Sequence, residues 1–349
     1  MTGQDGTRPA PLRVGTSGWS YPAGRGTWNG VFYPTPGSPS VVGGPPTGSD
    51  FALTAPTPPR ASRLASRARA FDELAYYAEH FDTVEVNSTF YRVPTPSVTA
   101  SWARRTPPDF EFAVKLYQRF THPSMFAEVS TEPASRPTTV DVDTFKRAID
   151  PLASAGKLGP VLAQFPPSFR VSPESTEFLD WLLDVFEDYA MAVELRHRTW
   201  SDRTADTLDL LNRHEAAWVQ IDEPKFRFSI RQNLLPNVRG FSYMRLHGRN
   251  ADKWWHHDAA EDRYDYLYSA EELEPFVEAA SVSRRLVKKL YLYMNNHFEA
   301  KAVANAVMLK HRLGEPVAGE YPQTFVERYP QVAGIVRLAT SPRPSRTSS

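Results

Sequence analysis

The segment Thr83-Val84-Glu85-Val86-Asn87 has the alternation of a β-strand and shows how the chain is organised. Successive side chains of a strand point to opposite faces, so the two valines share one face while Glu85 and Asn87 share the other. Such segments alternate along the chain with longer segments of helical spacing, which is typical of parallel β-α units. Eight units favour a closed barrel whose apolar face meets the helices. We therefore predict an α/β fold, a single (β/α)8 TIM-type barrel, with Glu85 and Asn87 pointing inward.

The predicted elements follow one another in regular order. Strands are expected at 13–17, 83–87, 111–115, 161–165, 192–196, 218–222, 242–247 and 290–295. Helical spacing predicts helices at 62–81, 96–105, 143–155, 173–188, 203–214, 270–286 and 298–313. The connection after the sixth strand lacks a long helical pattern, and we expect a short helix at 225–231. An open, doubly wound sheet is the alternative, but Gly15, Gly18 and Gly24 lack the spacing of its phosphate fingerprint.

Composition indicates one large domain with no general attraction to charged polymers. The chain has 349 residues, 41% of them hydrophobic, and its 40 basic residues balance 40 acidic ones. This balance does not favour nucleic acid or an anionic membrane as a partner. Cysteine is absent, which excludes disulfides, thiolate nucleophiles and cysteine-type zinc sites. The N-terminus has no apolar signal core and the chain has no transmembrane run, so we expect a cytoplasmic location.

Uneven proline and glycine content predicts the domain layout. We expect a flexible N-terminus, a barrel domain, a C-terminal extension packed on the barrel and a disordered tail, at 1–11, 12–318, 319–340 and 341–349 respectively. Two irregular insertions are expected in the barrel, near 36–60 and 124–142. Because both follow strands, we expect them to cover the mouth of the barrel.

The same alternation, applied to every strand, places polar side chains inward at the end of all eight. A barrel core is normally packed with Val, Ile and Leu, and each buried polar group without a hydrogen bond costs ~1–3 kcal/mol. A binding cavity is therefore the simplest cause. The structural alternative is a closed ion-pair network of carboxylates and basic groups, which serves the fold alone. The inward residues are Ser17, Glu85, Asn87, Lys115, Gln164, Glu194, Arg196, Gln220, Asp222, Arg245, His247 and Asn295.

Several of these residues lie in motifs that resemble those of one family. The motifs occur in order between about residue 13 and residue 313, and together they resemble the YecE-like family, known as domain of unknown function 72. The resemblance implies a TIM-type barrel and no particular reaction. The chain departs from the family pattern mainly by its two insertions. The motifs include Gly15-Thr16-Ser17-Gly18-Trp19-Ser20-Tyr21, Thr83 to Tyr91, Phe112-Ala113-Val114-Lys115, Gln164-Phe165-Pro166-Pro167, Glu194-Leu195-Arg196-His197, Arg245-Leu246-His247-Gly248 and Asn295-Asn296.

The first functional hypothesis is an enzyme that acts on an anionic small substrate, bearing phosphate or carboxylate, by general acid/base chemistry. The catalytic candidates are Glu85, Lys115, Glu194, Asp222 and His247. The substrate-binding candidates are Ser17, Trp19, Asn87, Tyr91, Gln164, Arg196, His197, Arg245, Asn295 and Asn296. We expect the anion between Arg245, His247 and the backbone at Asn296, because the helix beginning near Phe298 directs its positive end toward them.

Three alternatives stay open. The first is a metal-dependent phosphoester hydrolase of the endonuclease IV type acting on nucleic acid, with Glu85, Glu194, Asp222 and His247 as ligands to a divalent metal, although no HExxH spacing supports it. The second is a sugar-acting barrel enzyme, whose rim aromatics would stack on sugar rings. The third is a non-catalytic binding protein with an aromatic and basic rim. No nucleotide cofactor is expected.

Overall fold

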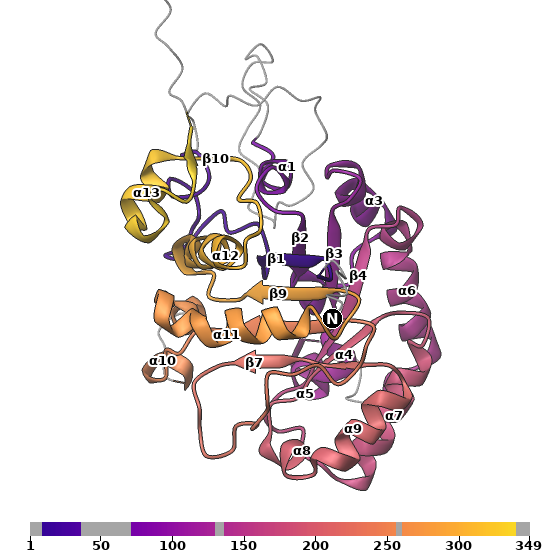
Figure 1. Ribbon diagram of the computed structural model, residues 1–349. Helices are drawn as coiled ribbons and strands as arrows, with labels where there is room; N and C mark the ends of the chain where they lie inside the picture. Colours follow the sequence, from indigo (N-terminus) through magenta and orange to yellow (C-terminus); the bar gives the residue numbers. More distant parts are fainter. Residues whose placement is uncertain (1–8, 36–70, 130–135, 256–259, 340–349) are drawn as a thin grey trace, which may run out of the picture.

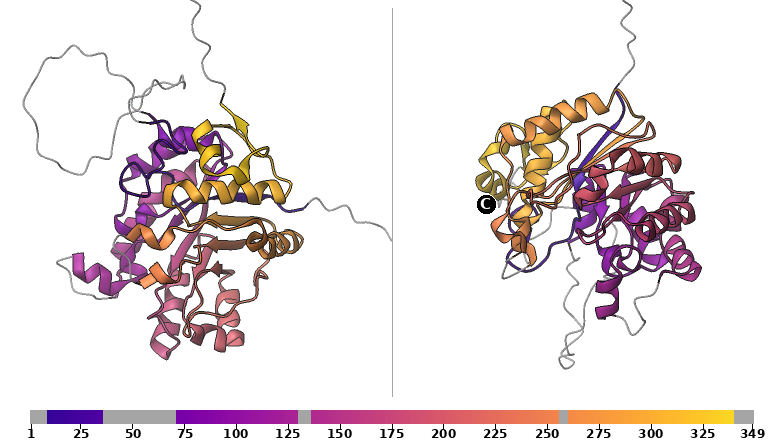
Figure 2. Two further views of the ribbon diagram at one scale, coloured as in Figure 1. Left: turned by 90° about the vertical axis from the view of Figure 1, so that its left-hand side faces the viewer. Right: turned by 90° about the horizontal axis from the view of Figure 1, so that it is seen from below.

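Parallel strands form the centre of the molecule and helices surround them (Figures 1 and 2). The computed structural model describes residues 9–35, 71–129, 136–255 and 260–339. The central strands are β1 (Leu12–Thr16), β2 (Thr83–Val86), β3 (Glu111–Lys115), β4 (Leu158–Gln164), β5 (Met191–Glu194), β6 (Ala217–Trp218), β7 (Gln220–Asp222), β8 (Ser242–Leu246) and β9 (Leu290–Met294). They pair in the orders β2-β3-β4-β5-β6 and β1-β9-β8-β7, always in parallel.

Backbone contacts join these two sheets on both sides. The strands β6 and β7 are halves of one strand on either side of Val219, whose N–H donates to the carbonyl of Val193 at 2.9 Å. At the other junction Ser17 forms a parallel bridge with Glu85, and the N–H of Gly18 donates to the Glu85 carbonyl at 2.7 Å. The strands therefore follow one another around a ring in chain order, and the predicted TIM-type barrel is confirmed.

Close packing between the first two strands depends on a glycine. A Cβ atom on Gly15 would lie 2.4 Å from the carbonyl oxygen of Thr83, which no side chain can tolerate without a shift of the backbone. This close approach brings the ends of β1 and β2 together, so Ser17 and Glu85 meet inside the barrel.

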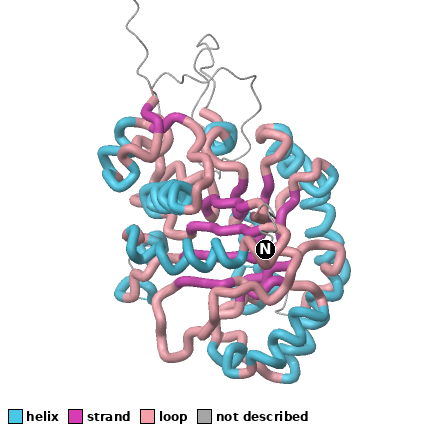
Figure 3. The backbone as a smooth tube through the Cα atoms, in the orientation of Figure 1, coloured by secondary structure: helices cyan, strands magenta, loops and turns pink. Residues whose placement is uncertain are grey.

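The long helices lie outside the strands, as the cyan tubes around the magenta ones show in Figure 3. They are α3 (Pro96–Arg104), α6 (Thr139–Ser154), α7 (Pro173–Val185), α9 (Thr204–Arg213), α11 (Ala270–Ser283) and α12 (Lys301–Arg312), and the shorter α1 (Glu73–Ala78) precedes β2. Capping boxes begin three of them, at Thr138, Ser172 and Ser269. In each, the cap side chain and the N3 side chain satisfy backbone N–H groups that the first turn leaves unpaired. Among the described residues, no helix is long and apolar enough to cross a membrane.

Short elements complete the described chain. They are α2 (Ser88–Tyr91), α4 (Gln118–Thr121), α5 (Pro123–Val129), α8 (Arg198–Asp202), α10 (Asp252–Trp255), α13 (Gln323–Arg328), the 3-10 turns η1 (Ala260–Tyr264), η2 (Phe298–Ala300) and η3 (Pro330–Val332), and the strands β10 (Glu320–Tyr321) and β11 (Arg337–Leu338). The last two strands pair with each other, outside the ring. The predicted division into barrel and C-terminal extension stays a prediction.

Three local predictions differ from the structure. The segment 225–231 forms no helix, because its backbone bonds instead to the chain after β5: Ile230 N–H donates to the Arg196 carbonyl, and Arg198 N–H to that of Phe228. The segment 124–142 is not irregular throughout, since α5 and the first turn of α6 lie in it. The helix expected at 62–81 is described only from residue 71 onward, and the helix found there is α1. Residues 62–70 and the insertion at 36–60 lie outside the described residues.

Candidate active site

A buried ion-pair network fills the barrel at the carboxyl ends of the strands. Arg245 on β8 donates to both carboxylate oxygens of Glu85 on β2, from Nε at 2.8 Å and from Nη2 at 2.7 Å. The hydroxyls of Ser17 and Tyr243 donate to the same carboxylate, each at 2.7 Å. These four side chains are buried. The Glu85 carboxylate therefore receives four hydrogen bonds and has little capacity left for a ligand.

The network continues from Arg245 to neighbouring strands. Its Nη1 donates to Glu194 at the end of β5, and the other oxygen of Glu194 accepts from Nε of Arg196 at 2.6 Å. His247 Nε2 lies 3.6 Å from Glu194 Oε1, while its Nδ1 lies 2.8 Å from the amide nitrogen of Asn295. Glu85 and Glu194 thus face two guanidinium groups, and Arg196 has a further buried carboxylate partner in Glu223, with Nη1 3.6 Å from Oε2.

Burial and neighbouring charges act in opposite directions on the pKa values of this network. Burial alone would raise the pKa of Glu194, but Arg245 and Arg196 hold it well below its usual value. For Glu85, burial raises the pKa and Arg245 outweighs it, so the pKa is lowered. Burial lowers the pKa of His247 to about 3, although Glu194 opposes the change. At neutral pH both carboxylates are charged and His247 is neutral, which makes all three poor proton-transfer groups.

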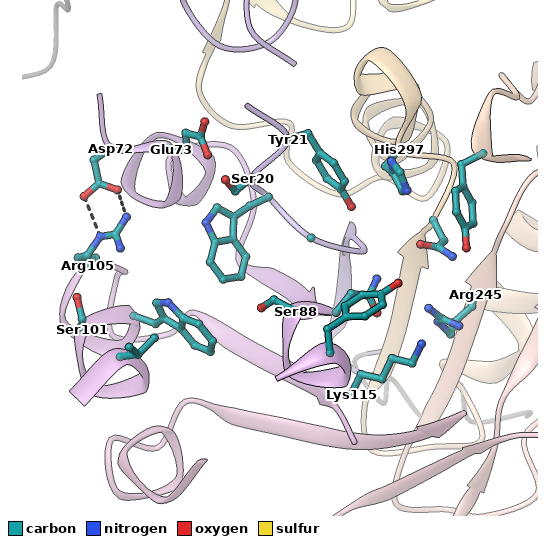
Figure 4. A pocket seen from close by; sticks show the side chains of 18 of the residues that line it. Ser20, Tyr21, Asp72, Glu73, Ser88, Ser101, Arg105, Lys115, Arg245 and His297 are labelled. Carbon is teal, nitrogen blue, oxygen red and sulfur yellow. Dashed lines mark hydrogen bonds and ion pairs between the residues drawn. The ribbon is translucent and has the colours of Figure 1, made fainter. Parts of the chain in front are cut away.

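A cavity of about 650 Å³ opens at this end of the barrel, a size typical of ligand sites. Arg245 and Lys115 lie at one end of it in Figure 4, and Asp72 with Arg105 lies at the other. Aromatic side chains form much of the wall. The lining residues are Gly18, Trp19, Ser20, Tyr21, Phe71, Asp72, Glu73, Asn87, Ser88, Tyr91, Val98, Ser101, Trp102, Arg105, Lys115, Gln164, Arg245, Tyr264, Asn295 and His297.

Lys115, at the end of β3, differs from the other basic groups of the cavity. Its Nζ donates to Oε1 of Gln164 at 2.7 Å and lies 4.0 Å from the centroid of the Phe90 ring. Among the described residues no carboxylate forms an ion pair with it. Burial lowers its pKa to about 7, and the positive charge of Arg245 adds to the effect. Lys115 is therefore poised to exchange a proton near neutral pH.

The predicted site residues fall into three groups. The first lines the cavity and contains Trp19, Asn87, Tyr91, Lys115, Gln164, Arg245 and Asn295. The second lies in the buried network behind the cavity and contains Ser17, Glu85, Glu194, Arg196 and His247. The third group, Asp222, His197 and Asn296, is not brought to the cavity. The prediction of one common cavity therefore needs correction for the second and third groups.

The third group is held by other contacts. Asp222 accepts from Nε of Arg249 at 2.8 Å and from the hydroxyl of Tyr268 at 2.7 Å. His197 caps α8, and its ring nitrogen accepts from the N–H of Thr199 at 3.2 Å. These partners come from loops after β5 and β8, whose course the strand pattern does not predict.

The expected anion site is also not formed. Asn296 donates to the carbonyl of Tyr266 at 2.7 Å and to Oδ1 of Asn305 at 2.8 Å, so its side chain ties two loops together. Ala300, the residue before α12, has a positive φ of 64°, and the helix begins at Lys301 rather than near Phe298. Arg245 is already neutralised by carboxylates. In the part of the chain that the structure describes, an anion would thus meet no free cation at the place expected.

The four proposed metal ligands do not converge. Among the described residues, no three His, Asp or Glu side chains form a group that could hold a metal ion. Glu85 and Glu194 are both bound to Arg245, whereas Asp222 is bound to Arg249. A cation would have to displace a guanidinium from a saturated carboxylate, so these residues do not fit a divalent metal.

Sequence reasoning missed much of the cavity wall. The ring of His297 is stacked on Tyr21, with centroids 4.4 Å apart. Tyr264 packs on the same His297 ring in a tilted arrangement, with centroids 4.6 Å apart. Asp72 and Arg105 form a salt bridge between α1 and the end of α3. Of these residues, only Tyr21 has a sequence signal, because it closely follows the first strand. The others come from helices and loops that only folding brings near.

The geometry defines a class of protein, a TIM-type barrel with one aromatic-walled cavity over a buried Glu-Arg-Glu network. The chain belongs to the family described as Protein of unknown function DUF72, which matches residues 63–327. It is similar to the UPF0759 protein YunF of Bacillus subtilis, with 27% identity over 258 residues, which are 72% of this chain and 90% of YunF. The UPF0759 protein YecE of Escherichia coli K12 is 34% identical over 126 residues, 36% of this chain and 41% of YecE.

Solved structures of the same family share the fold. A DUF72 family protein from Thermotoga maritima has 32% identity and a TM-score of 0.67, and the match covers 87% of this chain and all of that one. Another from Enterococcus faecalis has 21% identity and a TM-score of 0.68, over 89% of this chain and all of that one. The family confirms the resemblance found in the sequence motifs and leaves the reaction open.

Proposed function

We propose that this chain is an enzyme that transfers a proton on a small substrate, one that presents an anionic oxygen to Lys115. The observation that carries this proposal is the position of Lys115, whose Nζ lines the cavity with an amide and an aromatic ring as its neighbours instead of a carboxylate. Active sites of TIM barrels lie at this end of the strands. The proposal thus keeps the general acid/base chemistry predicted from the sequence. Of the five catalytic candidates, it gives the proton transfer to Lys115.

The buried network gives this lysine its character. The positive charges of Arg245 and Arg196 act to lower its pKa. Glu85 and Glu194 accept hydrogen bonds from those guanidinium groups. With its pKa lowered to about 7, the amine exchanges between the neutral and charged forms near neutral pH, and a bound anionic oxygen would raise this pKa again. The lysine can therefore accept a proton from the substrate and then stabilise the resulting charge.

Hydrogen exchange in deuterated water tests the proposal without knowledge of the substrate. The purified chain is incubated with a panel of small carboxylates, phosphate esters and carbonyl compounds, and loss of C–H signals is followed by NMR. We expect exchange for at least one compound class, a rate that rises with pH through about 7, and loss of exchange in Lys115→Met. Exchange that survives unchanged in Lys115→Met, with binding intact, would remove Lys115 from the mechanism.

A matched control separates chemistry from folding. Lys288 is an exposed lysine away from the cavity, so Lys288→Met should exchange at the wild-type rate. Lys115→Arg keeps a positive charge but cannot accept a proton, and it should bind anions without catalysing exchange.

A further inference from the structure

The cavity has a second polar end, built by residues that the proposed reaction does not use. Asp72, Glu73 and Arg105 are grouped there with Ser101, across the cavity from Lys115 in Figure 4. The cavity wall also includes Trp19 and Trp102, whose rings meet edge to face with centroids 5.4 Å apart. A ligand that reached from one end to the other would pass along these aromatic faces.

The distal end is held rigidly from two helices. Asp72 caps α1 by accepting from the N–H of Ala75 at 3.0 Å, and it also accepts from Nε of Arg105 at 2.9 Å. A second hydrogen bond joins Arg105 Nη2 to the same carboxylate. The guanidinium is therefore neutralised by Asp72, so among the described residues this end offers no free positive charge to a second anion.

Glu73 is placed differently from Asp72. Both Glu73 and Ser20 line the cavity, and the Ser20 side chain acts to lower the pKa of the Glu73 carboxyl group. Among the described residues no salt bridge to Glu73 is formed, and burial raises the pKa of its carboxyl group. Ser20, Ser101 and Glu73 thus supply hydroxyl and carboxyl groups, which can donate and accept hydrogen bonds at short range.

We propose that this distal cluster is a subsite for hydroxyl groups, so that the substrate is polyhydroxylated, with its anionic end at Lys115. Each hydroxyl needs both a donor and an acceptor, which the cluster provides. The apolar carbon face of a sugar-like chain suits the aromatic wall of Trp19 and Trp102. This inference rests on the proposed function for the position of the anionic end, but the subsite itself rests only on the distal residues.

Calorimetric titration tests the two ends separately. The probes are inorganic phosphate, a panel of hydroxylated anions (D-gluconate, D-ribose 5-phosphate, D-glucose 6-phosphate), the neutral polyols xylitol and D-glucose, and 2-aminoethyl phosphate. We expect at least one hydroxylated anion to bind ten-fold or more tightly than phosphate. Glu73→Ala and Ser101→Ala should each abolish most of this gain and leave phosphate affinity unchanged, whereas Lys115→Met should weaken both kinds of anion.

The outcomes distinguish the two proposals. Hydroxylated anions that bind no better than phosphate, or a gain that survives both distal variants, would overturn the subsite. If only 2-aminoethyl phosphate bound more tightly than phosphate, the subsite for hydroxyl groups would also be overturned, in favour of an ammonium ligand at Asp72 and Glu73. Binding of neutral polyols that Glu73→Ala removes and Lys115→Met does not would support the subsite and reject the anionic end. Glu79→Ala, an exposed carboxylate directly after α1, is the control and should bind all probes as the wild type does.

Discussion

Arg245 on β8 and Glu85 on β2 form a two-point ion pair across the inside of the barrel, with both nitrogen–oxygen distances below 3 Å. The strands that carry them are not neighbours in the ring, so the pair ties opposite walls together. Glu194 binds the remaining nitrogen of the guanidinium. One basic side chain thus organises the carboxyl ends of three strands.

Arg245→Met should destabilise the fold strongly. The change leaves Glu85 and Glu194 buried without their main positive partner, and breaking a buried pair costs ~3–5 kcal/mol. Urea titration monitored by circular dichroism measures the free energy of unfolding. Arg198, in an exposed pair with Asp202 on α8, is the matched control, and Arg198→Met should cost less than ~1 kcal/mol. Similar losses in both variants would show that the network contributes nothing special.

The network also predicts a loss of stability in acid. The pKa of Glu85 and of Glu194 is lower in the folded chain than the ordinary value of 4.5, so folding favours their charged forms. Their contribution is fully present above pH 4.5 and is lost as the pH falls through the folded values. Glu85→Gln should flatten the fall of the unfolding free energy below about pH 4.5. An unchanged slope in this variant would contradict the assignment.

Lys115 predicts a second rise of stability with pH, at higher pH, because here the buried charged form is the unfavourable one. Its pKa is lowered from 10.5 to about 7, so between these values the unfolded chain binds a proton that the folded chain does not. Stability should therefore rise with pH over this window, and the cost of burying the charge is greatest below pH 7. Lys115→Met should stabilise the chain at about pH 6 by on the order of 1 kcal/mol or more, with a gain that shrinks toward pH 10. A gain independent of pH would indicate improved packing instead.

The junction between the first two strands predicts a sharp difference between two glycines. Gly15→Ala would drive a Cβ atom against the Thr83 carbonyl oxygen, at 2.4 Å, and should cost ~1–3 kcal/mol. Gly240 has open space around its Cβ position, so Gly240→Ala should change stability by less than ~0.5 kcal/mol. Thermal unfolding of both variants measures the difference. Equal melting temperatures would mean that β1 and β2 are not in close contact.

Much of the fold follows from local pattern. Strand segments such as Thr83 to Val86 and Glu111 to Lys115 lie where alternation places them, because one face of each strand must be apolar against the helices. The same alternation sends Glu85, Glu194 and Arg245 inward, and their contacts with one another follow from the ring of strands. The helix predicted at 225–231 was wrong because this segment forms backbone hydrogen bonds with the connection after β5. Such distant bonds leave no signal in the local pattern, and here they outweigh helical spacing.

The amino-acid sequence by itself determined the family, the order of the strands, and the inward position of Glu85, Glu194 and Arg245. It could not decide which of these residues face a ligand and which face each other. That division depends on distances between strands far apart in the chain. Glu85 forms its ion pair with Arg245, whereas Lys115 contacts the amide of Gln164 and the ring of Phe90. The distal wall with Asp72 and Arg105 exists only once folding brings the start of α1 next to the end of α3. Only the tertiary structure fixes these charges against one another, because the distances between them are set by the packing of the strands, and so it alone distinguishes Lys115 from the other catalytic candidates.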